Sequence, residues 1–307
     1  MKVSISTKSY ESEGGNGRAR SIFQVVPVMR EIGFESLDLN LKDYDYSTYL
    51  LRGEDWKEKV LALKQLADSV DMEFYQAHSP TAKGGRIYGN PQFSAPGAVE
   101  EYREMVERNV IACSMLGVKW LIIHPITCPE YNYERRATLQ YNLDFWSPFV
   151  ELAGKLGTGL AFENQLPHLN RAHPYKYCEH YDDLLDLVDG YGVPQVGVCW
   201  DTGHANQNKF DQYRAITTIG SRLKALHLHD NFYGNKDEHM FPFMGEVSWE
   251  KVIRALAEVD YEGAINLETN KPVMYGYGEF QKVHLKLAYE TACYLRNWLE
   301  REKTSNK

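Results

Sequence analysis

The chain has 307 residues, of which 43% are hydrophobic and 25% charged, a composition typical of a globular protein and not of a disordered one. Its formal net charge of -8 at pH 7 argues against a nucleic-acid partner, because affinity for phosphate backbones depends on Lys and Arg. The five cysteines form no CxxC pair, and the sequence shows neither an apolar signal segment nor an apolar run of about 18 residues. We therefore expect a cytoplasmic protein without disulfides and without a membrane partner.

Short apolar runs that are typical of buried strands alternate with longer amphipathic runs that are typical of helices. The first strand is predicted at 3–7, and the first helix, at 21–32, ends before a glycine. The same alternation continues to a long helix at the end of the chain. The remaining predicted strands are 35–40, 73–80, 119–125, 159–164, the start of 196–206, 222–230 and 263–269. The remaining predicted helices are 56–70, 99–116, 134–156, 182–188, 210–219, 249–258 and 280–301.

Eight strand–helix repeats in a chain of this length predict an α/β fold, the (β/α)8 TIM barrel, formed by a single domain over residues 1–307. The repeats force parallel pairing, and eight strands close a sheet without a free edge. An open doubly wound sheet is the alternative, but its GxGxxG motif is absent, and Gly14–Gly17 is interpreted as a flexible loop. The C-terminal tail, about 302–307, is expected to be disordered.

Acidic residues and histidines lie at the predicted C-terminal ends of six strands, where TIM barrels carry their active sites. Side chains alternate along a strand, so all of these residues can face the mouth of the barrel in one register. One such residue alone would mean little, because a single His or Glu at a strand end is more often a hydrogen-bonded surface group. The residues are His78, His124, Glu163, Asp201, His227, His229 and Glu268.

Three of these residues, Glu163, Asp201 and Glu268, carry like charges that would converge at one rim. A bound cation is the simplest way to hold them together, since burying unpaired carboxylates is expensive. A ligand set that mixes carboxylates with imidazole suits Mn²⁺, Zn²⁺, Co²⁺ or Fe²⁺ better than Mg²⁺. The sequence therefore predicts a divalent metal site.

Four segments carry a resemblance to a known family: LAFEN around Glu163, VCWDTGHAN around Asp201, ALHLHDN around His227 and INLET around Glu268. They resemble the metal-ligand segments of the xylose-isomerase-like TIM barrels, in the sugar-phosphate isomerase/epimerase group that includes the ketose 3-epimerases, with endonuclease IV as a more distant relative. The resemblance implies one divalent metal ion, usually Mn²⁺, with Zn²⁺, Co²⁺ or Mg²⁺ as alternatives. It implies Glu163, Asp201, His227 and Glu268 as metal ligands and a contact between His204 and a substrate oxygen.

The resemblance favours a sugar isomerase or epimerase of carbohydrate metabolism that acts on a ketose or keto-sugar. Proton abstraction beside a carbonyl would pass through a metal-stabilised enediolate, with Glu163 and Glu268 as the acid/base pair and His204 orienting or protonating a substrate oxygen. Relatives are often dimers or tetramers, so a homo-oligomer with a small-molecule sugar ligand is expected. The candidates for substrate binding are His78, His124, His229, Asp237 and His239.

Two other functions fit the same residues. Endonuclease IV binds three zinc ions, and His78, His124, His204 and the Asp237–x–His239 pair fall in the matching segments, although the acidic net charge argues against a DNA substrate. A dehydratase or lyase acting on an inosose or keto-glycoside would begin with the same proton abstraction. The ketose epimerases carry a substrate-binding Arg soon after the seventh strand, and this chain has none there.

Overall fold

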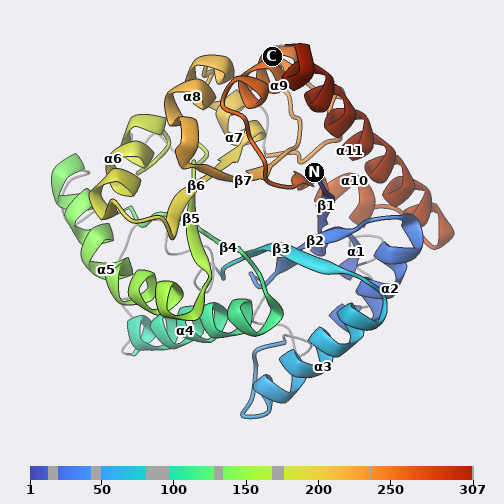
Figure 1. Cartoon of the computed structure of the whole chain (residues 1–307), viewed down its shortest axis with the longest axis horizontal. Coiled ribbons are helices and arrows are strands. Elements are labelled where there is room, and N and C mark those ends of the chain that lie inside the picture. Colours follow the sequence, from blue (N-terminus) through green and yellow to red (C-terminus); the bar gives the residue numbers. More distant parts are fainter. Residues whose placement is uncertain are drawn as a thin grey trace.

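The computed structural model describes residues 1–12, 20–42, 50–80, 97–127, 134–167, 176–234 and 237–305. Gly14–Gly17, interpreted above as a loop, lies outside these residues. The described part forms the (β/α)8 barrel that the sequence predicts, with eight parallel strands surrounded by helices (Figure 1). None of the described helices is both long enough and apolar enough to cross a membrane.

The strands pair in parallel in the order β7-β6-β5-β4-β3-β2-β1-β8. The first and last strands of this order meet through an isolated parallel bridge between Leu228 and Leu267, which closes the barrel. The strands are β1 (Val3–Ser6), β2 (Ser36–Asn40), β3 (Glu73–His78), β4 (Trp120–Ile123), β5 (Gly159–Glu163), β6 (Val196–Asp201), β7 (Leu223–His227) and β8 (Ile265–Leu267).

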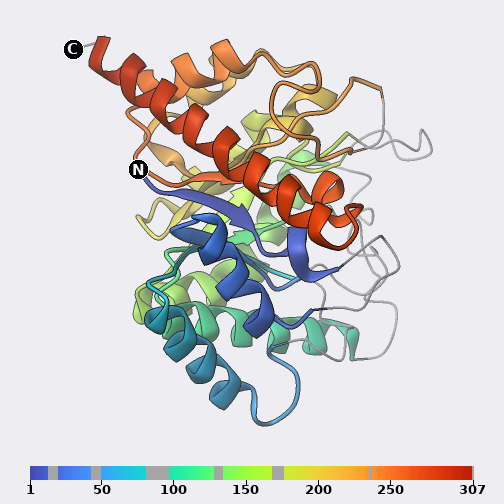
Figure 2. The same ribbon diagram turned by 90° about the vertical axis from the view of Figure 1, so that its right-hand side faces the viewer.

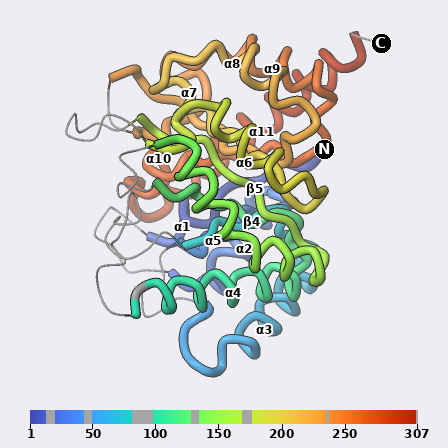
Figure 3. Tube along the Cα trace, turned by 90° about the vertical axis from the view of Figure 1, so that its left-hand side faces the viewer, coloured from blue at the N-terminus to red at the C-terminus, as the bar shows by residue number. Residues whose placement is uncertain are grey.

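Helices cover the outside of the barrel. The last helix, α11, lies along the outer face beside β1 and α2 (Figure 2), and α4 and α5 lie side by side at another part of the barrel wall (Figure 3). The helices are α1 (Lys8–Glu11), α2 (Ile22–Ile32), α3 (Trp56–Ser69), α4 (Ala98–Leu116), α5 (Arg135–Leu156), α6 (Tyr181–Tyr191), α7 (Thr202–Gln207), α8 (Gln212–Ile219), α9 (Trp249–Glu258), α10 (Asn270–Met274) and α11 (Glu279–Ser305).

Side chains of the strands alternate between the barrel interior and the layer under the helices. Ile122 and Ala161 belong to a small interior cluster, whereas Leu226 and Leu228 pack in the main hydrophobic core. The predicted alternation is therefore confirmed, and Glu163, two residues after Ala161, faces the interior. The main core is continuous from the first strand to the last helix, so the described residues form one domain.

Three short helices, α1, α7 and α10, are not predicted from the sequence. Each has only four to six residues, which is too short for an amphipathic period to appear. The helix α7 begins directly after β6, where the side chain of Asp201 accepts a hydrogen bond of 2.7 Å from the backbone N–H of His204. Asp201 is thus both the last residue of a strand and the N-cap of a helix.

The prediction of a disordered tail from residue 302 is wrong for its first four residues, and the last two lie outside the described part. The helix α11 continues to Ser305. Lys303 holds it there, because its Nζ donates to Asp260 Oδ1 and to the Tyr261 carbonyl oxygen, at 2.7 Å in both cases. This tertiary contact gives the last turn a partner that the local sequence does not reveal.

A buried carboxylate, that of Asp230, organises the segment between β7 and α9. Its two oxygens accept hydrogen bonds from the backbone N–H groups of Asn231, Phe243 and Val247 and from the indole N–H of Trp249, at 2.8–3.0 Å. Because these donors come from both ends of the segment, one side chain fixes both ends beside the rim of the barrel.

We expect Asp230→Ala to lower the free energy of unfolding by about 2–4 kcal/mol, since it leaves several buried N–H groups without an acceptor. Chemical denaturation measures the change. Asp189→Ala is the control, because that exposed residue pairs with Arg222 at the surface and its loss should cost less than about 1 kcal/mol. Equal effects of the two substitutions would contradict the role given to Asp230.

Candidate metal centre

The predicted site residues gather at the C-terminal ends of the strands. His78, Glu163, Asp201 and His227 are the last residues of β3, β5, β6 and β7, and Glu268 directly follows β8. No more than 3% of the surface of any of these five residues is exposed. Charged groups this deeply buried must be paired with one another or with a ligand.

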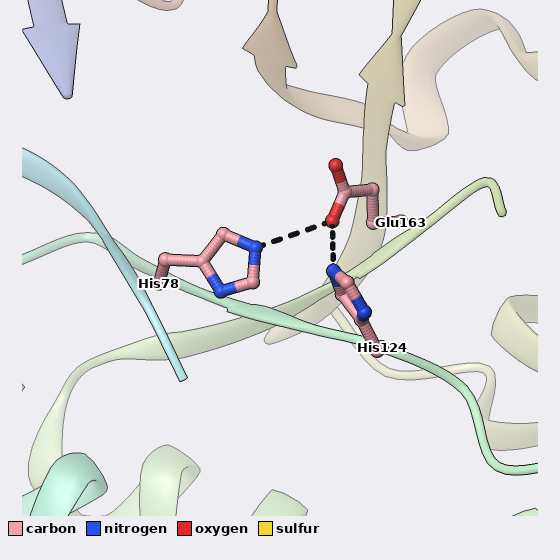
Figure 4. A group of neighbouring side chains, drawn as sticks. All are labelled: His78, His124 and Glu163. Atoms are coloured by element: carbon pink, nitrogen blue, oxygen red, sulfur yellow. Dashed lines mark ion pairs between the residues drawn. The ribbon is translucent and has the colours of Figure 1, made fainter. Parts of the chain in front are cut away.

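Glu163 lies among three imidazoles. His227 Nδ1 is 2.6 Å from Glu163 Oε1. At the other carboxylate oxygen, His124 Nε2 and His78 Nε2 are 2.7 and 3.4 Å from Glu163 Oε2 (Figure 4). These rings come from three further strand ends, so the carboxylate joins four parts of the rim. Burial alone would raise the pKa of the Glu163 carboxyl, but the charges of His227 and His124 outweigh it and hold that pKa well below its usual range.

Glu268, directly after β8, approaches the imidazole of His227 as well. Its Oε2 is 3.6 Å from His227 Nδ1, and its Oε1 is 3.4 Å from Lys42 Nζ. Burial would raise the pKa of the Glu268 carboxyl, whereas Lys42 and His227 hold it well below the usual range. Both glutamates are therefore carboxylates at neutral pH.

Asp201 is connected to this group through His204. The His204 Nδ1 atom lies 3.7 Å from Asp201 Oδ2 and 3.8 Å from Glu163 Oε1. Burial lowers the pKa of His204, but the carboxylates of Asp201 and Asp237 outweigh it and raise that pKa to about 9. The four residues predicted as metal ligands are thus linked by contacts at one end of the barrel.

The remaining predicted residues extend the cluster beyond Asp201. His229 Nε2 lies 3.0 Å from Asp201 Oδ1, and its ring stacks on that of His239 at 4.2 Å between centroids. His239 Nε2 lies 2.5 Å from Asp237 Oδ2. A side chain at Gly203 would collide with the His229 ring, because its Cβ would lie 1.9 Å from the nearest ring atom. Glycine at 203 therefore allows His229 to occupy this place.

Three histidines are oriented by the backbone. The Nδ1 atoms of His78, His204 and His239 lie 2.8–2.9 Å from the carbonyl oxygens of Ser79, Asn164 and Glu268. A carbonyl oxygen only accepts, so each Nδ1 donates, and each Nε2 faces the cluster. The orientation of these rings is therefore fixed by the path of the chain.

The donor atoms fit a divalent cation. Glu163 Oε2 and His78 Nε2 are buried and lie 3.4 Å apart, and His124 Nε2 lies 2.7 Å from the same carboxylate oxygen. Carboxylates and imidazoles in such proximity are the ligand types of Mn²⁺, Zn²⁺ and Co²⁺. Several sets of three residues bring one ligand atom each within 4.8 Å of one another. They include His78–His124–Glu163, His78–His227–Glu268, Glu163–Cys199–His227, Asp201–His204–His229 and His229–Asp237–His239.

Several residues near the cluster are not predicted from the sequence. Lys42 and Lys176 lie in segments after β2 and β5, and a sequence does not show where such segments lead. Burial lowers the pKa of Lys176 to about 8, against the opposing charge of Glu163. Asn164 holds Asp201 by a pair of hydrogen bonds to its backbone N–H and C=O, at 2.7 and 2.9 Å. Its place directly after Glu163 is the signal that could have identified it.

A family model described as the xylose isomerase-like TIM barrel matches residues 26–290. The match spans most of the chain and every strand-end residue of the cluster. The chain belongs to the xylose isomerase-like TIM barrel family. Membership confirms the resemblance inferred from the four segments around Glu163, Asp201, His227 and Glu268.

Two curated relatives of this xylose isomerase-like barrel match shorter stretches of the chain. The chain is 35% identical to the uncharacterized protein y4fM of Sinorhizobium fredii over 118 residues, which are 38% of this chain and 37% of that protein. It is 31% identical to the D-psicose 3-epimerase of Enterocloster bolteae over 102 residues, which are 33% of this chain and 31% of the epimerase. Each of these matches spans only about a third of the relative's length.

A solved structure covers the whole barrel. The crystal structure of a D-tagatose 3-epimerase-like protein matches this chain with a TM-score of 0.72 and 21% sequence identity, over 100% of both chains. At this identity the likeness establishes the fold, and the xylose isomerase-like barrel is thus found by sequence pattern, family model and structure alike.

The histidines near Asp201 predict a pH-dependent stability of the metal-free protein. The pKa values of His204 and His229 are raised to about 9 in the folded state, because the surrounding carboxylates outweigh burial, whereas an unfolded His titrates near 6.5. Their stabilising contribution is therefore fully present below pH 6.5 and is lost as the pH rises towards 9. We expect the free energy of unfolding to fall between pH 6 and 8.

Chemical denaturation of metal-stripped protein at the two pH values measures this fall. His229→Gln is the matched variant, and it should show a smaller decrease between pH 6 and 8. An unchanged or higher stability of the unmodified protein at pH 8 would contradict the charged state assigned to these rings.

Proposed function

We propose that this barrel is a divalent-metal-dependent isomerase or epimerase that acts on a ketose or keto-sugar. The observation that carries the proposal is the convergence of two buried carboxylates, Glu163 and Glu268, on Nδ1 of His227, at 2.6 and 3.6 Å. Two carboxylates beside one imidazole supply a base that removes a proton and a group that returns one. The similarity to a D-psicose 3-epimerase and the shared fold with a D-tagatose 3-epimerase-like protein support this reaction class.

In this proposal Glu163, Asp201, His227 and Glu268 hold one divalent ion. The mixed carboxylate and imidazole donors favour Mn²⁺, with Zn²⁺, Co²⁺ and Mg²⁺ as the alternatives. When bound, the ion polarises the substrate carbonyl and stabilises the negative charge that develops as the proton leaves.

Glu163 and Glu268 are the proposed acid/base pair. Because the pKa of each carboxyl lies well below its usual range, each is ionised at neutral pH and can accept the proton of the carbon beside the carbonyl. In an epimerisation, one carboxylate removes the proton from one face of that carbon. The other carboxylate then relays a proton from solvent to the opposite face of the same carbon.

His204 is the proposed group that contacts a substrate oxygen. With its pKa raised to about 9, the imidazole is protonated at neutral pH, while its Nδ1–H is already held by the Asn164 carbonyl oxygen. Its Nε2–H is therefore the hydrogen that it can donate to a substrate oxygen. The residues proposed to bind the rest of the sugar are His78, His124, His229, Asp237 and His239.

A second candidate function rests on the number of ligand groups. The set His78–His124–Glu163, which shares Glu163 with the proposed metal site, and the set His229–Asp237–His239 each bring three donors within 4.8 Å of one another. Sites for more than one ion favour the alternative of an endonuclease IV-like nuclease with three zinc ions. A dehydratase or lyase on an inosose or keto-glycoside shares the first step of the main proposal and differs in its product.

We expect Glu163→Gln and Glu268→Gln each to slow proton exchange by about 10²–10⁴-fold, since an amide cannot act as a general base. The measurement is deuterium incorporation from D₂O into ketoses, inososes and keto-glycosides, followed by NMR, which also identifies the product. The exposed Glu100→Gln on α4 is the matched control and should leave the exchange rate unchanged. Full exchange in both site variants would refute the acid/base assignment.

Metal removal separates the two candidate functions. We expect a chelator to abolish sugar proton exchange and one equivalent of Mn²⁺ per chain to restore it, because the proposed chemistry needs a single ion. Metal analysis of the purified protein gives the stoichiometry, and an abasic-site duplex tests for nuclease activity. Three zinc ions per chain together with cleavage of the duplex would favour the nuclease and overturn the sugar enzyme.

A further inference from the structure

A buried acid lies directly behind the proposed metal site. Asp38, in the middle of β2, has only 1% of its surface exposed. The interior of a TIM barrel is usually filled by branched apolar side chains, and a carboxylate at such a position is costly unless its charge has a partner. Among the described residues, the ion-pair partner of Asp38 is His227, with His227 Nε2 at 3.1 Å from Asp38 Oδ2.

The two nitrogens of His227 face different groups. A carboxylate oxygen only accepts, so His227 Nε2 donates its hydrogen to Asp38. The opposite nitrogen, Nδ1, forms a hydrogen bond of 2.6 Å with Glu163 Oε1 and lies 3.6 Å from Glu268 Oε2. A metal-ligating imidazole needs one nitrogen anchored as a donor, so that the other can exchange its hydrogen for an ion held between the two carboxylates.

The carboxylate of Asp38 is itself held in place by two side-chain amides. Gln76 Nε2 and Asn266 Nδ2 donate to Asp38 Oδ2 at 3.3 and 3.2 Å, and both also donate to the carbonyl oxygen of Leu226 at 3.2 Å. Leu226 precedes His227 in β7. The two amides therefore tie the anchor of the imidazole to the strand that carries the imidazole.

His227 differs in this respect from the other histidines oriented above. His78, His204 and His239 donate from Nδ1 to backbone carbonyl oxygens, whereas His227 donates from Nε2 to a side chain. Its orientation consequently depends on the side chains of Asp38 and Glu163 and not on a backbone carbonyl oxygen. The negative charge of Asp38 also makes the imidazole a stronger donor to a cation.

We propose that Asp38 is a positioning residue for metal binding, acting through His227 without touching the ion or the substrate. It fixes the tautomer that carries the hydrogen on Nε2 and aims Nδ1 at the point between Glu163 and Glu268. The inference rests on the proposed function in so far as His227 is taken as a metal ligand. To the proposed function it adds a reason for the metal affinity of the site: a residue that does not contact the ion holds one of the ligands in place.

The test is a double-mutant cycle read out as metal affinity. Apoprotein of the full chain is titrated with Mn²⁺ and with Zn²⁺ in competition with a chelator, for Asp38→Ala, His227→Ala and the double variant. We expect Asp38→Ala to weaken binding by about 10–100-fold, as loss of such a partner does in other metal sites. In the His227→Ala background, the same substitution should cause no further loss, since Asp38 acts only through that ring.

Asp38→Asn keeps the shape of the side chain and removes its charge, so it guards against a folding defect. Its carbonyl oxygen can take the place where three donors converge, and we expect a loss of affinity smaller than that of Asp38→Ala. Asp183→Asn, which removes a buried carboxylate paired with Arg135 on the outside of the barrel, is the matched control and should bind metal normally. Thermal unfolding without metal confirms that each variant is folded.

The hydrogen on His227 Nε2 can also be observed directly by NMR. In Co²⁺-loaded protein, the His227 Nε2–H should give a hyperfine-shifted proton resonance that exchanges slowly with solvent, because that hydrogen is buried and bonded to Asp38. We expect the resonance to exchange rapidly or vanish in Asp38→Ala. A merely structural role of Asp38 would leave it unchanged in any variant that stays folded.

Wild-type metal affinity in the Asp38 variants, or an equal loss with and without His227, would overturn the inference. If the wild type also shows metal-dependent proton exchange in the sugar, either result would refute the role of Asp38 and leave the proposed function supported. If the double-mutant cycle gives the expected result but no sugar exchanges protons, the role of Asp38 is supported and the proposed function is refuted. Absence of metal binding by the wild type would refute both.

Discussion

The burial of carboxylates against imidazoles at one end of the barrel is the constraint on which the rest of this structure depends. Removing such charges from water costs several kcal/mol each, so every member needs a fixed partner. The fold supplies these partners with rigid parts: strand tips, backbone carbonyl oxygens and the N-terminus of α7. Most residues of the cluster therefore lie at the ends of regular strands, and the segments between strands and helices contribute the others.

Much of the fold could be predicted from the sequence because its signals are local. Strands show as short apolar runs and helices as longer amphipathic ones, and eight repeats leave few arrangements open. The alternation along the strands correctly placed Glu163 on the interior side of β5, two residues after Ala161 of the interior cluster. The short helices were not predicted, because a helix that follows an N-cap such as Asp201 for only a few residues shows no helical period in its apolar residues. The end of α11 was not predicted, because it depends on a tertiary contact, that of Lys303 with Asp260.

The candidate site likewise contains residues that the sequence predicts and residues that it does not. Residues at strand ends, such as His78 and Glu163, are visible in the sequence because the barrel brings every strand end to one rim. Asp38 is not visible: it sits in the ordinary strand segment SLDLN, and its partner His227 lies 189 positions later. Lys42 and Lys176 approach the cluster from segments whose course depends on packing. The residues that support the strand-end side chains cannot be predicted from the sequence, because they are defined by contacts across the barrel.

The four hydrogen bonds accepted by Asp230 have a consequence for how such a barrel can diversify. They fix the two ends of the segment between β7 and α9, while Asp237 and His239 lie between these ends. Because the ends are fixed, changes in the length or composition of the part between them need not disturb the strands. The outer part can then change in sequence or in length while the strand-end cluster of carboxylates and imidazoles stays intact.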